Sequence, residues 1–504
     1  MTLVNRRVLQ ETTLLLAALF AMFWAILRAR VQSMTIDESV TYTMFVHGWF
    51  RTVLVPSSNN HVLNTLLMWI TTHLFGNSPL SVRIPALMGA ALYIFICYFL
   101  CQSIASQFSL RFSLFLCLTY NPFIFDFMVA ARGYSLADAF LLAAIAAPVW
   151  HQVKGWPSLP TSCALASLGL GLSFSANFSF AFVDFAAFLF IVTWAIRSRG
   201  MESRARILKF CILPGLFAAL VICGYPLARW QKGDLNWGAD SLHKMTQSLV
   251  ESSLYRLDPR FARSGWYKAI DLLKPWLLPV LGILCVGQVI ATRLDGSWLQ
   301  DTRARWLRRL AAALAGIAIL TVLMHWLAFR LVKLPLPLGR TGIYLVPLCT
   351  LIAGIIAAAP ARSLASQWLR RSITAVFICL ACYFLLCLRM NYFKEWEWDA
   401  DVKDVYPVLA RFNHAYGVTE VGTSWFYVAS LNYYRELSNR ENFPEFIATL
   451  PDPPLGKSVY VVHGVVERGF LEREKLVVVY QGKATGVVVA VRPDGRIPAT
   501  LIER

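Results

Sequence analysis

The chain of 504 residues combines few charged residues with a strongly positive net charge. Hydrophobic residues make up 57% of it, charged residues only 15%, and its mean hydropathy is +0.54. These values exclude an ordinary soluble protein, whose surface needs many more charged groups. The formal charge of +18 does not indicate nucleic-acid binding, because the basic residues form short clusters between apolar runs instead of a patch with interleaved aromatic residues.

The eleven cysteines predict neither disulfides nor a metal site. All of them fall in or beside apolar segments, where a free cysteine behaves as a small hydrophobic residue. The closest group, Cys379, Cys382 and Cys387, has no partner histidines and lacks the spacing of a zinc ribbon.

Many windows of the chain are apolar enough to cross a membrane, because a span needs roughly 20 mostly apolar residues. The first window follows two arginines, lacks a small-residue cleavage site and is therefore predicted to remain as an anchor. The run 61–75 is too short to span and predicts an interfacial helix. About eleven spans are predicted, at residues 12–28, 84–104, 112–128, 134–150, 161–175, 178–196, 208–229, 273–291, 309–331, 341–360 and 371–390.

The basic residues predict the orientation of these spans in an inner membrane. With the N-terminus in the cytoplasm, clusters of Lys and Arg fall in the cytoplasmic loops, whereas the opposite loops are mixed in sign. An odd number of spans then places the C-terminus outside. The predicted cytoplasmic clusters contain Arg197, Arg199, Arg204, Arg206, Lys209, Arg293, Arg303, Arg305, Arg308, Arg309, Arg362, Arg370 and Arg371.

The character of the chain changes after residue 390, where long apolar runs end. Periodicity predicts helices over 401–416 and 425–437, and β-rich runs predict strands at 419–423, 458–463, 476–480 and 486–491. The predicted fold is therefore a polytopic α-helical membrane domain followed by a small C-terminal α/β domain. The predicted boundaries are 1–390 for the membrane domain, 29–83 for its first outside loop, and 391–504 for the extracytoplasmic domain.

Polar residues from distant parts of the sequence fall at one leaflet in this topology. Ionisable residues in a membrane are costly unless they pair or serve a site, so their convergence indicates a function. The loop 231–272 lies on the same predicted side and is expected to cover the site, because it is long and amphipathic. The converging groups are Asp37, Glu38, Asn59, Asn60, His61, Asp126, Arg132, Tyr134, Asp138, Asp184 and Arg340.

These residue types suit group transfer from a lipid phosphate. A carboxylate such as Asp37 or Glu38 can deprotonate an acceptor hydroxyl as a general base, and either can bind a divalent cation. The arginines and His61 suit a phosphate, because a guanidinium bridges two oxygens and neutralises the charge that develops on a leaving group. No cofactor is indicated with certainty, and a metal bound by Asp37 and Glu38 remains open.

The motifs of the first 150 residues resemble the GT-C glycosyltransferases, and more narrowly bacterial members related to protein O-mannosyltransferases and lipid A aminoarabinose transferases. Gly339-Arg340 and Tyr344-x-x-Pro347 support this resemblance later in the chain. The motifs that carry it are Thr35-Ile36-Asp37-Glu38-Ser39, Asn60-His61-Val62-Leu63-Asn64, Leu74-Phe75-Gly76-Asn77-Ser78, Arg83-Ile84-Pro85 and Ala131-Arg132-Gly133-Tyr134.

The resemblance implies an inverting transfer of a sugar from a polyprenyl-phosphate donor to an acceptor hydroxyl at the outer face. It implies that Asp37 is the catalytic base and Glu38 its neighbour. His61 occupies the histidine of a segment that reads His-Pro-Pro in many relatives, although both prolines are absent here. The positions expected to bind substrate or lipid phosphate are Asn60, His61, Arg132, Tyr134 and Arg340.

Each of these residues also has a structural interpretation. An Asp-Glu pair beside a helix is commonly a cap and a partner of the helix dipole. Arg132 is equally expected to pair with Asp126 or Asp138, as buried charges usually do. His61 can simply begin an interfacial helix, and Arg340 can be an arginine that snorkels from a helix end.

Two other functional classes remain open from the sequence. A flippase for lipid-linked sugars, or another transporter, is expected to have broken helices in matched halves and polar residues at mid-membrane, and no matched halves are found. A non-catalytic envelope assembly protein is expected to tolerate loss of Asp37. The partners predicted are the bilayer and a polyprenyl-phosphate sugar, without nucleic acid, while the sugar, the acceptor and the oligomeric state are not predicted.

Overall fold

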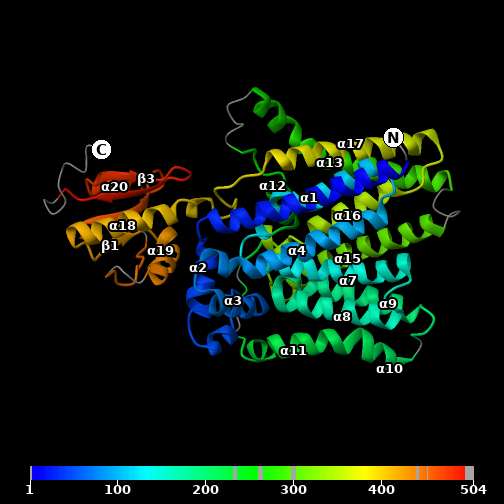
Figure 1. The fold of residues 1–504 in the computed structure, drawn as a ribbon, viewed down its shortest axis with the longest axis horizontal. Helices are drawn as coiled ribbons and strands as arrows, with labels where there is room; N and C mark the ends of the chain where they lie inside the picture. The colour runs from blue at the N-terminus through cyan, green and yellow to red at the C-terminus, as the bar shows by residue number, and fades with distance from the viewer. Residues whose placement is uncertain are drawn as a thin grey trace.

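The structure is a computed structural model that describes residues 3–201, 203–230, 235, 237–258, 265–296, 302–438, 442–450 and 452–493. Long helices form a bundle, and a small part that contains the sheet lies at one end of it, beside α2 and α3 (Figure 1). The described N-terminal residues lie at the other end of the bundle. This arrangement agrees with the predicted fold of a membrane helix bundle followed by a small α/β region.

Nine helical segments in the described part of the chain are long and apolar enough to cross a membrane. Each overlaps a predicted span, so the chain is a multi-pass membrane protein. The helices of these segments are α1 (Leu3–Val31), α4 (Pro79–Ile104), α7 (Tyr134–Lys154), α8 (Leu159–Ala176), α9 (Ala181–Ile196), α11 (Leu213–Ala228), α13 (Gly265–Leu294), α15 (Thr302–Val332) and α17 (Leu364–Leu386). The short helix η3 (Phe178–Phe180) precedes α9, and the short helices α10 (Arg204–Ile207) and η4 (Leu208–Ile212) precede α11.

Two predicted spans correspond to shorter helices, α5 (Phe108–Thr119) and α16 (Leu345–Ala358). The predicted span 112–128 is interrupted because Pro122, which lacks an N–H, starts a separate helix α6 (Pro122–Phe127). The number of helices that cross the membrane therefore stays a prediction. The remaining short elements are α2 (Ile36–Thr41), η1 (Tyr42–Val46), η2 (Phe50–Leu54), α3 (Val62–Phe75), α12 (Leu242–Ser253), η6 (Gly339–Gly342) and η7 (Glu397–Asp399).

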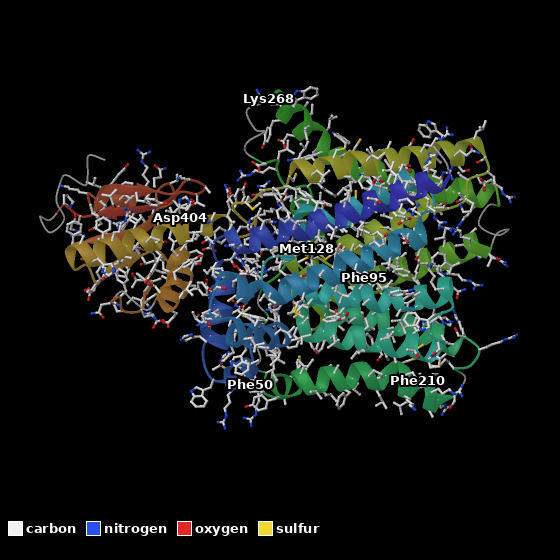
Figure 2. The ribbon with its side chains drawn as sticks, in the orientation of Figure 1. Phe50, Phe95, Met128, Phe210, Lys268 and Asp404 are labelled. Atoms are coloured by element: carbon white, nitrogen blue, oxygen red, sulfur yellow. The ribbon has the colours of Figure 1, made fainter. Side chains whose placement is uncertain are left out.

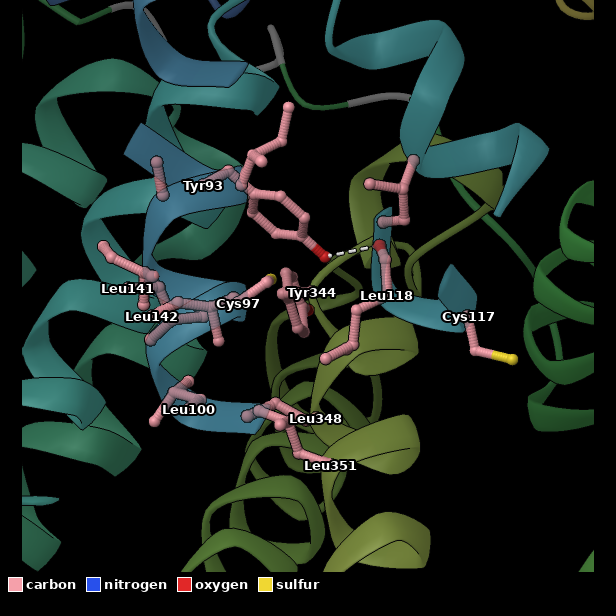
Figure 3. Close-up of a cluster of buried hydrophobic side chains, with 14 of the residues drawn as sticks. Tyr93, Cys97, Leu100, Cys117, Leu118, Leu141, Leu142, Tyr344, Leu348 and Leu351 are labelled. Carbon is pink, nitrogen blue, oxygen red and sulfur yellow. Dashed lines mark hydrogen bonds between the residues drawn. The ribbon is translucent and has the colours of Figure 1, made fainter. Parts of the chain in front are cut away.

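Small residues allow the helices of the bundle to approach closely. A Cβ atom on Gly171 of α8 would lie 2.2 Å from the carbonyl oxygen of Gly215 in α11, so a larger residue would force these helices apart. Between the helices, Tyr93 donates a hydrogen bond of 3.1 Å to the carbonyl of Leu118 (Figure 3). This buried cluster of side chains fixes α4 against α5, and Tyr344 lies in the same cluster.

The outer surface of the bundle is apolar, as a lipid-facing surface requires. Phe95, labelled in Figure 2, is 54% exposed, and Phe217 is 70% exposed. In a soluble protein such exposure would cost free energy, whereas lipid tails solvate these side chains.

The C-terminal part contains every helix and strand predicted for it, together with α20, which was not predicted. Its mixed sheet has the order β1-β2-β4-β3, in which β1 and β2 are parallel and the other neighbours antiparallel. Figure 2 labels Asp404 on its first helix, α18. The elements are α18 (Val402–Tyr416), β1 (Val421–Thr423), α19 (Trp425–Ser438), β2 (Val459–His463), α20 (Arg468–Arg473), β3 (Val477–Gln481) and β4 (Val487–Val491).

The C-terminal part packs directly on α2. Asp399 accepts hydrogen bonds from the backbone N–H of Ile36, at 2.7 Å, and from the hydroxyl of Ser430 in α19, at 3.1 Å. The hydroxyl of Tyr434 accepts a hydrogen bond of 3.0 Å from the N–H of Met34. These buried bonds fix the first turn of α2, the short helix that carries the predicted catalytic acid.

Candidate functional site

A cavity of about 400 Å³ lies at the end of the bundle near α2 and η6. Its polar side is formed by the first loop, the turn before α7, and η6, while its other walls are aromatic and aliphatic. The polar lining residues include Ser58, Asn59, His61, Arg132, Tyr134, Asn177 and Arg340, and the apolar ones include Phe174, Phe178, Phe182, Leu227, Trp230, Leu235, Trp237 and Pro335. A charged headgroup and an apolar chain can therefore both be accommodated.

Asp37 lies behind two arginines that line this cavity. Its Oδ2 atom is 2.5 Å from Nη1 of Arg340 and 3.9 Å from Nε of Arg132. The side chain of Asp37 is 18% exposed, so it is reachable while being largely shielded from water. The structure thus brings together three of the predicted site residues, which are separated by as many as 303 positions in the sequence.

Arg132 is positioned by a turn that requires glycine. Gly133 has a φ of +75°, and a Cβ atom there would lie 2.2 Å from the carbonyl oxygen of Ala176. The guanidinium of Arg132 donates to the hydroxyl of Thr41 at 2.6 Å and to Oδ1 of Asn59 at 2.5 Å. The turn and these two bonds hold the guanidinium at the cavity.

The alternative that Arg132 pairs with Asp126 or Asp138 is wrong. Asp126 instead accepts from Arg28, whose Nη2 atom lies 2.6 Å from Oδ1 of Asp126. Arg132 turns toward the first loop and Asp37, because the short turn before α7 directs it away from the acids of the neighbouring helices.

Glu38 is bound on all sides by structural partners. Both of its oxygens accept from Arg83, at 2.9 and 2.7 Å, and the N–H groups of Ala131 and Thr35 donate to it at 2.8 and 3.0 Å. With the Thr35 hydroxyl accepting from the N–H of Glu38, this forms a capping box at the start of α2. The geometry favours a positioning role for Glu38 over the predicted catalytic one.

The same contacts argue against a cation bound by Asp37 and Glu38, which the sequence left open. Both oxygens of Glu38 face Arg83, so the two carboxylates cannot coordinate one ion without breaking a buried ion pair. Across the described residues, no group of three or more His, Cys, Asp or Glu side chains is arranged to hold a metal. The residues present therefore do not fit a metal bound by this pair.

Asn59, not the predicted Asn60, faces the cavity. Asn60 is fully buried, and its amide donates to the carbonyls of Val53 and Val55 at 2.9 and 2.8 Å, so it shapes the loop. His61 lines the cavity at the N-cap of α3, where neither ring nitrogen has a hydrogen-bond partner among the described residues. Its ring centroid lies 5.8 Å from that of Tyr134, so both predicted residues are in place to contact a ligand.

Two site residues were missed by the sequence analysis. Glu395 lies 3.2 Å from Nη1 of Arg340, and the guanidinium of Arg340 stands 5.4 Å from the ring centroid of Trp396. Both residues follow the last predicted span on its outer side, and the charged and aromatic residues 394–397 at that position were the available signal.

Burial and the neighbouring charged side chains shift the pKa values of three site residues. Burial opposes ionisation of Asp37, but Arg132 and Arg340 outweigh it, so the pKa of Asp37 lies below its ordinary value. Burial and the two arginines lower the pKa of His61 well below its ordinary value, so its imidazole is neutral. Burial raises the pKa of Glu395 despite the attraction of Arg340.

Part of the predicted covering loop lies over the cavity. Ala239 and Leu336 exchange backbone hydrogen bonds of 2.7 and 2.9 Å, and the neighbouring Trp237 lines the cavity. Residues 231–234, 236 and 259–264 of the predicted cover lie outside the described residues. The described segment supports the prediction that this loop closes one side of the site.

Comparisons with known proteins find likeness in structure alone. No protein-family model matches the chain, and no curated protein sequence matches it. The crystal structure of ArnT from Cupriavidus metallidurans in the apo state is similar with a TM-score of 0.55, at 11% identity over 97% of this chain and 98% of that one. The ArnT structure bound to undecaprenyl phosphate has a TM-score of 0.53, at 11% identity over 97% and 99% of the two chains.

The likeness extends over the helices and over the C-terminal part, because nearly the whole of both chains is covered. The chain has the fold of ArnT, and this confirms, at the level of the fold, the resemblance to the GT-C glycosyltransferases that its motifs predict.

Proposed function

We propose that this protein is a membrane glycosyltransferase that moves a sugar from a polyprenyl-phosphate donor to an acceptor hydroxyl. One observation carries the proposal: a part-buried carboxylate, Asp37, meets Arg132 and Arg340 beside a cavity with apolar walls. The ArnT fold supports it, because one ArnT structure holds undecaprenyl phosphate.

The donor phosphate binds between Arg132 and Arg340. Each guanidinium can donate two parallel hydrogen bonds to phosphate oxygens, and the low exposure of both side chains strengthens these contacts. The aromatic and aliphatic walls hold the first isoprene units of the lipid. Trp396 stacks on Arg340 and keeps its guanidinium plane toward the site.

The transfer is a single displacement with inversion. Asp37 accepts the proton of the acceptor hydroxyl while the oxygen of that hydroxyl forms a bond to the anomeric carbon. The bond from that carbon to the phosphate oxygen breaks, and its electron pair leaves with the polyprenyl phosphate. Arg132 and Arg340 stabilise the charge that this oxygen gains.

Binding of the phosphate also activates the base. While Arg132 and Arg340 face Asp37, its lowered pKa makes it a weak base. When the two guanidinium groups donate their hydrogen bonds to the phosphate, its negative charge offsets their attraction for Asp37, and the pKa of Asp37 rises. The carboxylate is therefore a competent base only when the donor is bound.

The site faces the extracytoplasmic side of an inner membrane in this proposal. The loops with the clusters of Arg and Lys lie at the end of the bundle with the N-terminus, and the site lies at the other end, beside the sheet (Figure 1). Positively charged loops are retained in the cytoplasm, so the opposite end and the C-terminal part lie outside.

The test measures consumption of a panel of polyprenyl-phosphate sugars by purified protein, with membrane extract as the source of acceptor. Wild type is expected to consume one donor, and Asp37→Asn to consume none while remaining folded. Parallel samples with a chelator test metal dependence. If no donor is consumed although known transferases consume theirs in the same extract, a transporter or an assembly protein becomes the better account.

A further inference from the structure

A second cavity, of about 420 Å³, lies between α7, α9 and α15, away from the candidate active site. Its lining begins at Thr302 and Arg305, near the start of α15, and continues along that helix to Ile317. This start of α15 lies at the end of the bundle that carries the basic loops (Figure 1). The cavity is therefore an elongated groove parallel to the helices, with one end at the basic surface.

The basic end of the groove carries two guanidinium groups that have no counter-charge among the residues that the structure describes. Arg305 and Arg309 lie one turn apart on the same face of α15, and both line the groove. No acidic residue lines it, and among the described residues neither arginine forms an ion pair, although Arg305 donates a hydrogen bond of 3.3 Å to the hydroxyl of Thr302. Gln152 of α7 adds a polar group at this end, so the lining suits an anion.

The rest of the groove is apolar and has the dimensions of a lipid chain. From Arg309 to Ile317 the groove extends over eight residues, about 12 Å of helix, compared with about 15 Å for one leaflet of the hydrocarbon core. Phe190 forms its floor against α15, because Gly316 has no Cβ and an added one would lie 2.3 Å from Cζ of that ring. Trp194 and Trp306 lie at its basic end, where indoles favour the membrane interface.

We propose that this groove binds an anionic membrane phospholipid. The phosphate lies between Arg305 and Arg309, and one acyl chain follows the stripe formed by Leu310, Ala313 and Ile317. Basic pockets between membrane helices hold anionic headgroups in this way, since charge and apolar burial act together. The proposal is independent of the proposed transferase activity, because the groove shares no lining residue with the first cavity.

The test titrates purified full-length protein in neutral detergent with phosphatidylglycerol and measures bound lipid by native mass spectrometry. Arg305→Gln/Arg309→Gln removes the headgroup contacts, and Ala313→Trp fills the apolar part without changing charge. The matched control, Arg308→Gln/Arg371→Gln, removes two exposed charges that do not line the groove. Thermal unfolding of each variant verifies that it is folded.

We expect one saturable phosphatidylglycerol site in wild type and in the control pair. Affinity falls by about tenfold or more in the double variant, the size expected for a lost charge-assisted hydrogen bond, and binding is also lost in Ala313→Trp. Equal loss in both charge pairs would contradict the proposal, because it would indicate only general attraction. Undiminished binding in Ala313→Trp, or a site that takes polyprenyl phosphate and not phosphatidylglycerol, would also contradict it.

If a variant unfolds, photolabelling of wild-type protein in native membranes tests the proposal instead. A phospholipid with a photoreactive group on its acyl chain is activated in membranes that contain wild-type protein. Labelling concentrated on Leu310–Ile317 is expected, and labelling spread evenly over the exposed faces of α11 and α13 would overturn the assignment.

Discussion

Nη1 of Arg340 lies 2.5 Å from Oδ2 of Asp37 and 3.2 Å from Oε1 of Glu395. One guanidinium therefore bridges two carboxylates that come from the first loop and from the segment after the last long helix. The Arg340 side chain is only 16% exposed, so water and salt screen these charges little. A donor phosphate must compete with both carboxylates for this group, which makes Arg340 central to donor binding.

Replacing Arg340 is expected to weaken donor binding. Arg340→Gln removes charge-assisted hydrogen bonds of about 1.5 to 3 kcal/mol, so the dissociation constant of the donor rises about ten- to hundredfold. Arg340→Lys recovers only part of this, because an ammonium group lacks the planar fork. A lipid-binding titration measures the effect, with Arg330→Gln, an exposed arginine near the end of α15, as the control. Unchanged affinity in Arg340→Gln would remove Arg340 from the phosphate site.

Glu38→Gln is expected to lower stability more than it changes chemistry. Breaking a fully buried ion pair costs about 3 to 5 kcal/mol, because Arg83 keeps a buried and uncompensated charge. Thermal unfolding in detergent should show a markedly lower Tm, whereas Glu472→Gln, in an exposed pair with Arg468, should change it little. An unchanged Tm together with lost turnover would restore the catalytic role predicted for Glu38.

Glu395→Gln is expected to raise the Tm near neutral pH. The folded-state pKa of Glu395 lies above its unfolded value of about 4.5, so its ionisation is less favourable in the folded protein. This cost is present at pH values above the folded pKa and disappears as pH falls below the unfolded one. The gain in Tm of Glu395→Gln over wild type should therefore shrink as the pH is lowered. Glu472→Gln, which changes an exposed glutamate, is the control. A lower Tm at neutral pH would show that the bond to Arg340 outweighs burial.

Gly238→Ala is expected to open the cover of the cavity. A Cβ atom at Gly238 would lie 2.4 Å from the carbonyl oxygen of Leu336 and 2.5 Å from Cβ of Pro335, so the bridge at Ala239 must shift. Turnover should fall several-fold while the Tm changes little. Gly224→Ala is the matched control, because a Cβ there meets nothing within 4 Å. Equal activity in the two variants would argue against a covering role.

Local elements were predictable because they depend on residues close in sequence. The apolar runs located the long helices, and β-rich apolar runs located the C-terminal strands, including Val459–His463. The prediction failed to separate α5 from α6, since the apolar run continues through Pro122 although its missing N–H ends the helix.

Pairing between distant residues was predictable only in part. Motifs indicated that Asp37, His61, Arg132 and Arg340 lie at one site, and the structure brings them together. No local sequence pattern indicates that Glu38 forms an ion pair with Arg83, 45 residues away, or that Glu395 forms one with Arg340. Such contacts depend on how the C-terminal part packs on α2, which no single-sequence pattern encodes.

The most direct test of the account is single-turnover transfer by wild type and Asp37→Asn, with donor binding measured separately on the same preparations. The donor is the polyprenyl-phosphate sugar that wild type consumes. Loss of a general base is expected to slow transfer about 10²- to 10⁴-fold, while the donor binds at least as tightly because Arg132 and Arg340 have one fewer competing charge. The exposed Asp404→Asn serves as the control. Transfer at the wild-type rate by folded Asp37→Asn would contradict the account.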